Sequence, residues 1–189
     1  MDAPRFLADA MLGRLARWLR VIGRDTLYLP ASTPDAELVA RAAADERVLL
    51  TRDRHLLREL RPARALEIRS DLPLDQLRQV VQTYRLAPPR ELFTRCLLCN
   101  SVLSAVADDQ VPALVPASAR DLPGPVRRCS TCGRVYWRGS HARRMHAALA
   151  SALPEWYPYV VAGGAVRGSR PLTARRGGSD SWRRIVSRR

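Results

Sequence analysis

Residues 48–53 read VLLTRD, a short aliphatic run that ends in Thr51, Arg52 and Asp53. Such a run is typical of a strand that is buried on both faces of a parallel sheet. On both sides of it, strand-like and helix-like segments alternate up to Pro88. The other strand-like segments are residues 5–8, 25–29 and 65–68, and the helix-like segments are residues 11–22, 36–46, 55–60 and 74–84. This order predicts an α/β fold with a parallel sheet flanked by helices.

Three aspartates lie where predicted strands end or helices begin. Asp9 follows the first strand, Asp53 follows the strand at 48–50, and Asp35 begins the helix that precedes that strand. Because ligand sites of parallel sheets lie beyond the carboxyl ends of the strands, we expect Asp9 and Asp53 at one edge, with Asp35 entering from the helix start. Clustered carboxylates favour a hard divalent cation, Mg²⁺ or Mn²⁺. Alternatively, Asp35 is a helix cap and the other two are exposed loop residues.

Four cysteines form two C-x2-C pairs, Cys96 with Cys99 and Cys129 with Cys132, separated by 29 residues. Two such pairs place four thiolates about 2.3 Å from one Zn²⁺ ion. Asn100 and Gly133, which follow the pairs, permit the sharp turns that such a site requires. With four protein ligands the site is closed, so we predict a structural zinc. The alternative is two disulfides.

The chain carries 32 basic and 18 acidic residues, a formal charge of +14, which favours a polyanionic partner such as nucleic acid. All the basic residues are arginine, so a coding bias is an alternative source of the excess. The residues with a predicted role in nucleic-acid binding are Arg14, Arg17, Arg20, Arg52, Trp137 and Arg138. The first three lie on the polar face of the predicted helix 11–22, for which a solvated surface is the alternative. Arg52 and Thr51 stand beside Asp53, where they can orient a ligand or contact phosphate.

Composition divides the chain into three parts. Residues 1–88 form the α/β domain, and residues 89–160 form a second module around the cysteines, closed by a helix over 141–153. We expect Trp156, Tyr157 and Tyr159 to dock that helix onto the first domain. Residues 161–189 hold eight arginines, five glycines and one aspartate, and are predicted to be a disordered basic tail.

Two features bear on location. No window approaches ~18 uninterrupted apolar residues, and the first residues lack a basic segment followed by an apolar run. We therefore expect a cytoplasmic protein that does not associate with membranes and whose cysteines stay reduced.

Several motifs in a fixed order resemble the Mut-seven C-terminal RNase domain family, over about residues 5–150. The shared segments are FLAD at 6–9, MLGRLARWLR at 11–20, GRDT at 23–26, DAEL at 35–38, VLLTRD at 48–53, RC-x2-CN at 95–100, C-x2-CG at 129–133 and VYW-x-GSH at 135–141. The resemblance implies a PIN-like nuclease domain with an appended zinc ribbon, in which Asp9, Asp35 and Asp53 hold the catalytic metal. No residue matches a fourth acidic ligand cleanly, and Glu37 and Asp71 are the candidates.

The sequence thus predicts a metal-dependent ribonuclease that hydrolyses RNA phosphodiester bonds, with Mg²⁺ or Mn²⁺ at the three aspartates and a zinc ribbon that assists RNA binding. The alternative is a non-catalytic RNA-binding or protein-interaction module. A nuclease should lose hydrolysis with a chelator, whereas a binding module should bind RNA in a salt-dependent way without cleaving it.

Overall fold

The computed structural model describes residues 3–156. Its larger sheet has four parallel strands in the order β2-β1-β3-β4, which confirms the predicted parallel sheet. The strands are β1 (Phe6–Ala8), β2 (Thr26–Tyr28), β3 (Val48–Thr51) and β4 (Ala65–Glu67). Ala8 lies opposite both Tyr28 and Leu50, so the strands end at one common edge of the sheet.

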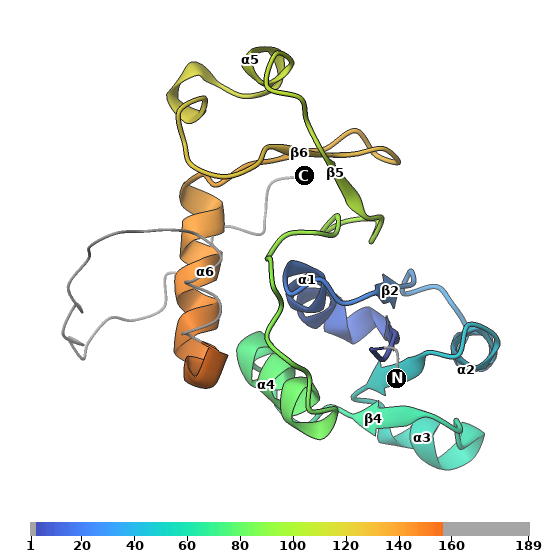
Figure 1. Ribbon diagram of the computed structural model, residues 1–189. Coiled ribbons are helices and arrows are strands. Elements are labelled where there is room, and N and C mark those ends of the chain that lie inside the picture. The colour runs from blue at the N-terminus through green and yellow to red at the C-terminus, as the bar shows by residue number, and fades with distance from the viewer. Residues whose placement is uncertain (1–2, 157–189) are drawn as a thin grey trace.

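Helices cover both faces of this sheet (Figure 1). α1 (Gly13–Val21) and α4 (Pro73–Thr83) pack on one face, and α2 (Asp35–Ala44) and α3 (Arg54–Leu60) on the other. The predicted helix at 11–22 is shorter than expected, because Ala10–Leu12 form a 3₁₀ turn, η1, before α1 begins. Gly13 starts α1 without a side chain because the ring of Tyr28 lies only 3.1 Å from where a Cβ would stand.

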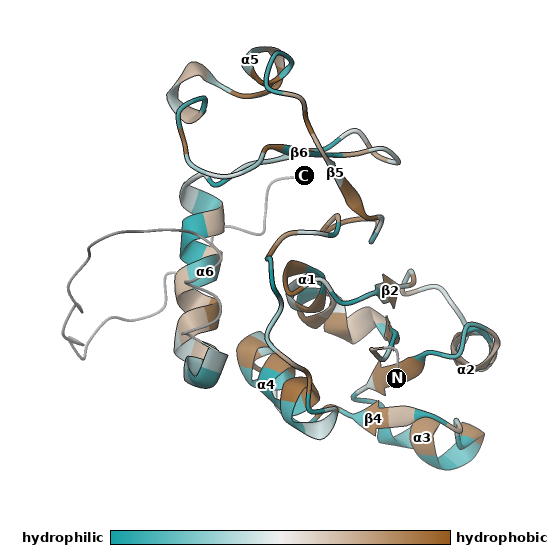
Figure 2. Cartoon of the chain, in the orientation of Figure 1, coloured by the Kyte–Doolittle hydropathy of each residue, from teal (hydrophilic) through white to brown (hydrophobic). Residues whose placement is uncertain are grey.

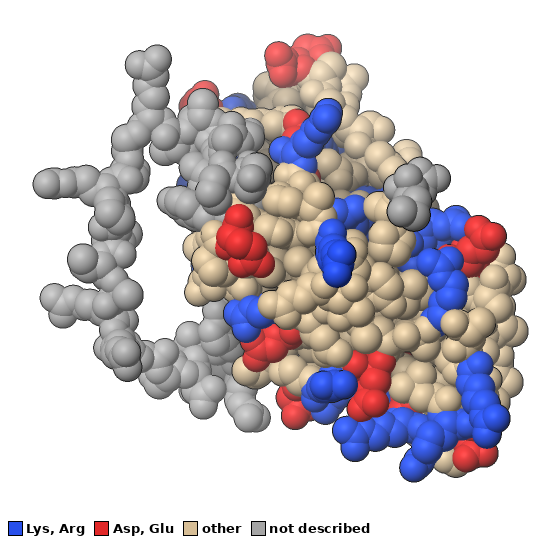
Figure 3. Space-filling model, turned by 60° about the horizontal axis from the view of Figure 1, so that its bottom comes forward, with Lys and Arg blue, Asp and Glu red and all other residues tan. Residues whose placement is uncertain are grey.

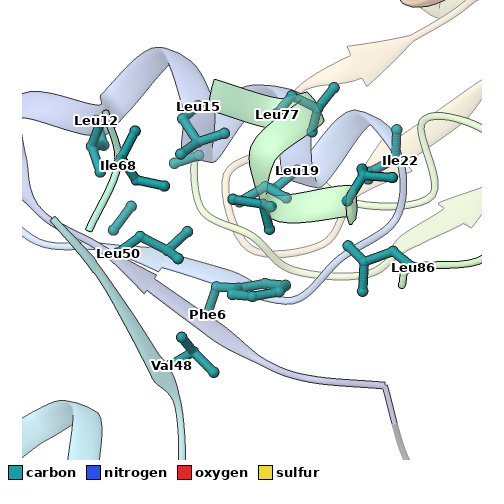
Figure 4. Close-up of a cluster of buried hydrophobic side chains, with 14 of the residues drawn as sticks. Phe6, Leu12, Leu15, Leu19, Ile22, Val48, Leu50, Ile68, Leu77 and Leu86 are labelled. Carbon is teal, nitrogen blue, oxygen red and sulfur yellow. The ribbon is translucent and has the colours of Figure 1, made fainter. Parts of the chain in front are cut away.

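Two apolar cores follow from the alternation of side chains along the strands. Phe6 and Leu50 point toward α1 and α4, where Leu15 and Leu19 meet them (Figure 4). The opposite face is built on Leu7 and Leu49, which pack against α2 and α3. In Figure 2 the helices around the sheet carry both brown hydrophobic and teal hydrophilic residues, as amphipathic helices do. Both faces of β1 and β3 are therefore buried, as the aliphatic run at 48–50 predicted.

A second, smaller unit contains the cysteines, and we call residues 94–139 the cysteine module. Its antiparallel sheet has the order β5-β6-β7, formed by β5 (Leu103–Ala105), β6 (Arg127–Cys129) and β7 (Val135–Tyr136). The long connection between β5 and β6 contains a short helix, α5 (Val111–Leu114), and the 3₁₀ turn η2 (Ala117–Ala119).

The last described helix, α6 (Ser140–Ala152), leaves the cysteine module and returns to α4 (Figure 1). Leu149 and Leu153 join the core around α1 and α4, together with Trp156 of the 3₁₀ turn η3 (Pro154–Trp156). Docking by Trp156 is thus confirmed, whereas Tyr157, Tyr159 and the predicted tail at 161–189 lie outside the described residues. None of the helices in residues 3–156 has the length and apolar character needed to cross a bilayer.

Candidate active site and cysteine cluster

Asp9 stands directly after β1 at the common edge of the sheet, as predicted. Its Oδ2 accepts a hydrogen bond of 2.7 Å from the hydroxyl of Thr51, the last residue of the neighbouring strand β3. Thr51 is fully buried, so its hydroxyl is held in place by the strand itself. No other donor in the described part of the chain reaches the Asp9 carboxylate, which leaves Oδ1 available to a cation or to water.

Asp53 is linked to the same hydroxyl. Its backbone N–H donates to Thr51 Oγ1 over 3.0 Å. Its Oδ1 accepts hydrogen bonds from the backbone N–H groups of His55 and Leu56, which makes Asp53 the N-cap of α3. The second oxygen, Oδ2, has no protein donor within residues 3–156. One threonine therefore fixes both Asp9 and the backbone of Asp53, and each aspartate presents one unengaged oxygen.

Asp35 occupies the first turn of α2, and Pro34 rather than Asp35 is the N-cap. The alternative interpretation of Asp35 as the N-cap of α2 is therefore wrong, and the aspartate that caps a helix is Asp53, at α3. Asp35 is exposed, and the loop 29–34 separates it from the end of β2. The three aspartates do not form a group with ligand atoms within 4.8 Å of one another. In the described chain, only the four cysteines form such a group.

The candidates for a fourth acidic ligand take different positions. Glu37 is exposed in the first turn of α2. Asp71, in the loop between β4 and α4, forms an ion pair with Arg52. Arg52 therefore lies at the sheet edge, as its position beside Asp53 predicted, but it is engaged by a carboxylate in this structure.

Arg14 and Arg17 are exposed on α1, and Arg14 lies in the first turn of the helix that follows Asp9. They remain suitable for phosphate contact. On the face shown in Figure 3, arginines gather mainly on the right and lower-right side of a mostly uncharged surface, and carboxylates lie among and beside them. Carboxylates thus interrupt the positive charge on this face.

The predicted exposure of Arg20 is wrong. Arg20 is only 4% exposed, although it lies on the arginine-bearing side of α1. Its Nε donates to Thr26 O, and its Nη1 donates to the carbonyls of Leu97 and Leu98, inside the first C-x2-C pair. The cysteine module covers this part of α1, and Arg20 supplies donors to one buried carbonyl of β2 and to two partly buried carbonyls of the module. Arg20 is therefore structural and is not available to nucleic acid.

The four cysteines meet as the spacing predicted. Cys96 Sγ lies 3.5 Å from Cys132 Sγ, and Cys99 Sγ lies 3.4 Å from Cys129 Sγ. A disulfide requires about 2.05 Å, whereas four sulfurs at about 2.3 Å from a tetrahedral zinc are about 3.8 Å apart. All the cysteines are free, and this cluster can hold a zinc ion.

Matching turns shape the two halves of the cluster. Asn100 N–H donates to Cys96 O, and Gly133 N–H donates to Cys129 O. Asn100 and Gly133 have φ angles of 69° and 73°, the left-handed conformation expected from their residue types. The sharp turns predicted after each pair are therefore present.

Hydrogen bonds favour the thiolate form of Cys96. Burial raises the pKa of its thiol, but hydrogen bonds from the N–H of Cys99, the hydroxyl of Tyr136 and the N–H of Leu98 lower it to about 6. Burial raises the pKa of Tyr136, which keeps its hydroxyl a donor. A deprotonated sulfur is the form that binds metal, so these contacts prepare Cys96 as a ligand.

Asn100 also connects the cluster to the larger sheet, a role that the sequence did not indicate. Its Oδ1 accepts from Thr26 N–H at 3.0 Å, and its Nδ2 donates to Asp25 Oδ1 at 2.8 Å. Asp25 in turn pairs with Arg47, which is 8% exposed, at 2.6 Å. From its position directly after Cys99, the sequence predicted for Asn100 only a role in the turn. Nothing in the sequence indicated its contacts with residues more than 70 positions away.

Trp137 and Arg138, the last predicted nucleic-acid contacts, directly follow β7 and are half-buried. They are thus separate from the aspartate edge and border the start of α6.

Comparison with known families gives one finding. The model of a family described as the Mut7-C RNAse domain matches residues 4–149. No match was found among curated proteins or solved structures. The matched range includes the three aspartates, the four cysteines and every residue with a predicted role in nucleic-acid binding.

Proposed function

Because the chain belongs to the Mut7-C RNase domain family, we propose that it is a metal-dependent ribonuclease with a PIN-like catalytic domain. One structural observation carries the proposal. The Thr51 hydroxyl joins Asp9 to the backbone of Asp53 at the edge where parallel sheets bind ligands. Asp35 stands at the start of α2, after the neighbouring strand β2.

Asp9 and Asp53 each present an unengaged carboxylate oxygen, the kind of ligand that a hard cation prefers, and the three carboxylates would have to draw closer together than they lie in this structure to bind one ion. In this proposal Asp9, Asp35 and Asp53 hold Mg²⁺ or Mn²⁺, which supplies charge neutralisation at the phosphodiester and favours attack by water on phosphorus. Thr51 fixes the direction of the Asp9 carboxylate. Arg14 is close enough in sequence and exposed enough to contact a phosphate beside Asp9.

We assign a structural zinc to the four cysteines. All four positions of a tetrahedral ion would be taken by protein sulfurs, so no position is left for substrate. A Zn²⁺ ion with four thiolates has a net charge of 2−. The buried guanidinium of Arg20 lies near Cys96 and Cys99 and offsets part of this negative charge. The role of this ion is thus to hold the cysteine module against α1 and β2.

The test is incubation of the purified protein with mixed RNA in Mn²⁺, in Mg²⁺ and in EDTA. We expect cleavage with either ion and none in EDTA. Asp9→Asn, Asp35→Asn and Asp53→Asn should each reduce cleavage by at least ~100-fold, because each removes a negative charge from the cation. Asn is as good an N-cap as Asp, so Asp53→Asn should leave α3 intact.

Asp109→Asn is the matched control, since Asp109 is exposed in the cysteine module and remote in sequence from the three aspartates. Zinc content is measured after EDTA treatment, so that loss of the cysteine-bound ion is not mistaken for loss of the catalytic one. If the three Asn variants cleave as fast as the parent, the site is wrong. RNA binding without cleavage in either ion would favour a non-catalytic binding module.

A further inference from the structure

A cleft of about 630 Å³ lies between the linker after α4, the loop before β6, the end of β7 and the start of α6. Figure 1 shows the elements that surround it, with α6 on one side and the linker on the other. All the residues that line the cleft fall between 89 and 146. The cleft is therefore built by the linker at 89–93, the cysteine module and α6, and contains none of the three aspartates.

The charge of the cleft is predominantly positive. Its lining includes four arginines and two histidines against a single carboxylate, Glu91. Glu91 is engaged by Arg127. Within residues 3–156, the other arginines of the lining, Arg90, Arg138 and Arg143, have no carboxylate partner. The upper turns of α6, which carry Arg143, are hydrophilic in Figure 2. Such a cleft is complementary to a polyanion.

Aromatic rings lie among these arginines. Phe93, Tyr136 and Trp137 line the cleft, and all of them are half-buried. The Trp137 ring rests against Gly139, where a Cβ would stand 2.9 Å from Nε1. The Arg138 side chain likewise packs on Gly124, where a Cβ would stand 2.6 Å from Cδ. Gly139 and Gly124 thus leave room for the side chains of Trp137 and Arg138 in the cleft.

Tyr136 connects the lining of the cleft to the cysteine cluster. The Tyr136 hydroxyl contacts Cys96 Sγ at 3.2 Å and accepts from Leu97 N–H at 3.1 Å, while its ring lines the cleft. Arg127, in the same wall, donates to the carbonyls of Leu92 and Phe93 in the linker. These contacts fix the Tyr136 ring and join the linker to β6, so the framework of the cleft is formed before a ligand binds, which reduces the entropy lost on binding.

We propose that this cleft binds single-stranded RNA, with bases stacked on Trp137 and Phe93 and phosphates bound by Arg90, Arg138 and Arg143. Aromatic side chains among arginines are the combination that recognises unpaired nucleotides. The volume, about 630 Å³, falls in the range of sites that hold small ligands, and is enough to hold splayed bases. The choice of RNA as the nucleic acid rests on the proposed ribonuclease function, and the cleft would hold substrate at a distance from the catalytic edge.

The test compares two double variants with equal loss of charge on the same elements. Arg138→Ala/Arg143→Ala removes two arginines of the cleft, and Arg134→Ala/Arg144→Ala removes exposed neighbours that do not line it. Fluorescence anisotropy measures binding of a labelled oligouridylate of about 12 nucleotides, without added divalent ions. We expect the Kd of the cleft variant to rise at least ~10-fold and that of the control at most ~3-fold.

Base stacking is tested separately. Trp137→Leu should weaken binding of the single strand by about 5-fold or more, and Trp137→Phe should restore most of it. A duplex of the same length should bind more weakly than the single strand. Zinc content and melting temperature identify a variant that has not folded. The single variants Arg143→Ala and Arg144→Ala, both on the helix surface, then serve as the comparison.

Equal Kd values for the two double variants would overturn the proposal. The proposal would also be overturned if poly-glutamate displaced the labelled RNA as well as unlabelled RNA does, and equally from the parent and from Trp137→Leu. The cleft would then be a site for acidic protein segments. This result is independent of catalysis. Cleavage that requires Asp9 together with unchanged binding by the cleft variant would refute the cleft alone. Cleft-dependent binding with no cleavage by the parent would refute the ribonuclease alone.

Discussion

Asn100 Oδ1 accepts a hydrogen bond of 3.0 Å from the backbone N–H of Thr26. Thr26 begins β2, the outermost strand of the parallel sheet on this side, and its carbonyl accepts from Arg20 Nε. Both backbone groups of Thr26 thus point away from β1 and are bonded by side chains of α1 and the cysteine module. The module closes an edge that would otherwise expose unpaired strand groups. The cysteine cluster and the sheet are therefore one hydrogen-bonded structure.

Arg20→Met should destabilise the fold by about 2–4 kcal/mol. Methionine keeps the apolar stem but leaves the buried carbonyl of Thr26 and the partly buried carbonyls of Leu97 and Leu98 without the donors they have now. Arg17→Met is the matched control on the same helix, and because Arg17 is exposed its effect should stay within about 0.5 kcal/mol. Urea unfolding measures both. Equal free energies of unfolding for the two variants would contradict the structural role of Arg20.

The layered fold could be predicted because burial leaves a local pattern in sequence. The run at 48–50 is buried on both faces, and the helix-like segments before Pro88 each place an apolar stripe against the sheet. The cysteine cluster was equally predictable, because two C-x2-C pairs fix ligand geometry through short turns. Asp9 and Asp53 were placed at the correct edge because parallel strands share their carboxyl ends.

Polar contacts between distant segments could not be predicted in the same way. Arg20 falls on the charged side of α1 by periodicity, and it is buried there because the first C-x2-C pair of the cysteine module packs over that side. Thr51 was noted as a residue able to orient a ligand, but its bond to Asp9 depends on the alignment of β1 with β3. The closing helix predicted over 141–153 was expected to dock onto the first domain through Trp156, and its own Leu149 and Leu153 also pack in that core. Such contacts depend on tertiary placement, which periodicity does not encode.

Zinc removal should loosen the edge of the sheet as well as the cysteine module. We expect one zinc per chain by elemental analysis, and none in Cys129→Ser. Because Asn100 immediately follows a ligand, its bond to Thr26 should weaken when the cluster is lost, and amide hydrogen exchange at Thr26 should accelerate by at least ~10-fold. The amide of Leu49, bonded to Arg64 O across β3 and β4, is the internal control. Equal protection of Thr26 with and without zinc, or two disulfides in fresh protein, would contradict this prediction.

Asp25 should make stability depend on pH in the acid range. Burial raises the pKa of its carboxyl, but hydrogen bonds from Arg47 and Asn100, with the charges of Arg47 and Arg95, lower it below its ordinary value of 3.8. The unfolded chain therefore takes up this proton at a higher pH than the folded chain. The stabilisation is fully present above 3.8 and is lost as the pH falls through the lower folded value.

The measurement is the free energy of unfolding in urea from near neutral pH to below 3.8. Asp25→Asn should be less stable than the parent at neutral pH by about 1.5–3 kcal/mol, since Arg47 loses its charged partner. The difference between the two proteins should shrink as the pH falls. Both contain the same cysteines, so thiol protonation cancels in the comparison, and Asp108→Asn controls for loss of an exposed carboxylate. A difference that is constant with pH would contradict the pKa shift of Asp25.

Thr51→Val should impair catalysis through the metal ion. Valine has nearly the shape of threonine but lacks the hydroxyl that donates to Asp9 Oδ2 and accepts from Asp53 N–H. Loss of a residue that orients ligands typically lowers metal affinity or activity by about 10–100-fold. We therefore expect the Mn²⁺ concentration for half-maximal RNA cleavage to rise by that factor, and Thr51→Ser to restore most of the original Mn²⁺ affinity.

Thr26→Val is the matched control, because Thr26 is also a fully buried strand residue, and its hydroxyl donates to Arg24 O instead. Both Val variants should lower the melting temperature, but only Thr51→Val should shift the Mn²⁺ dependence. An identical Mn²⁺ dependence for the two variants would show that Thr51 supports the fold and does not position the aspartates.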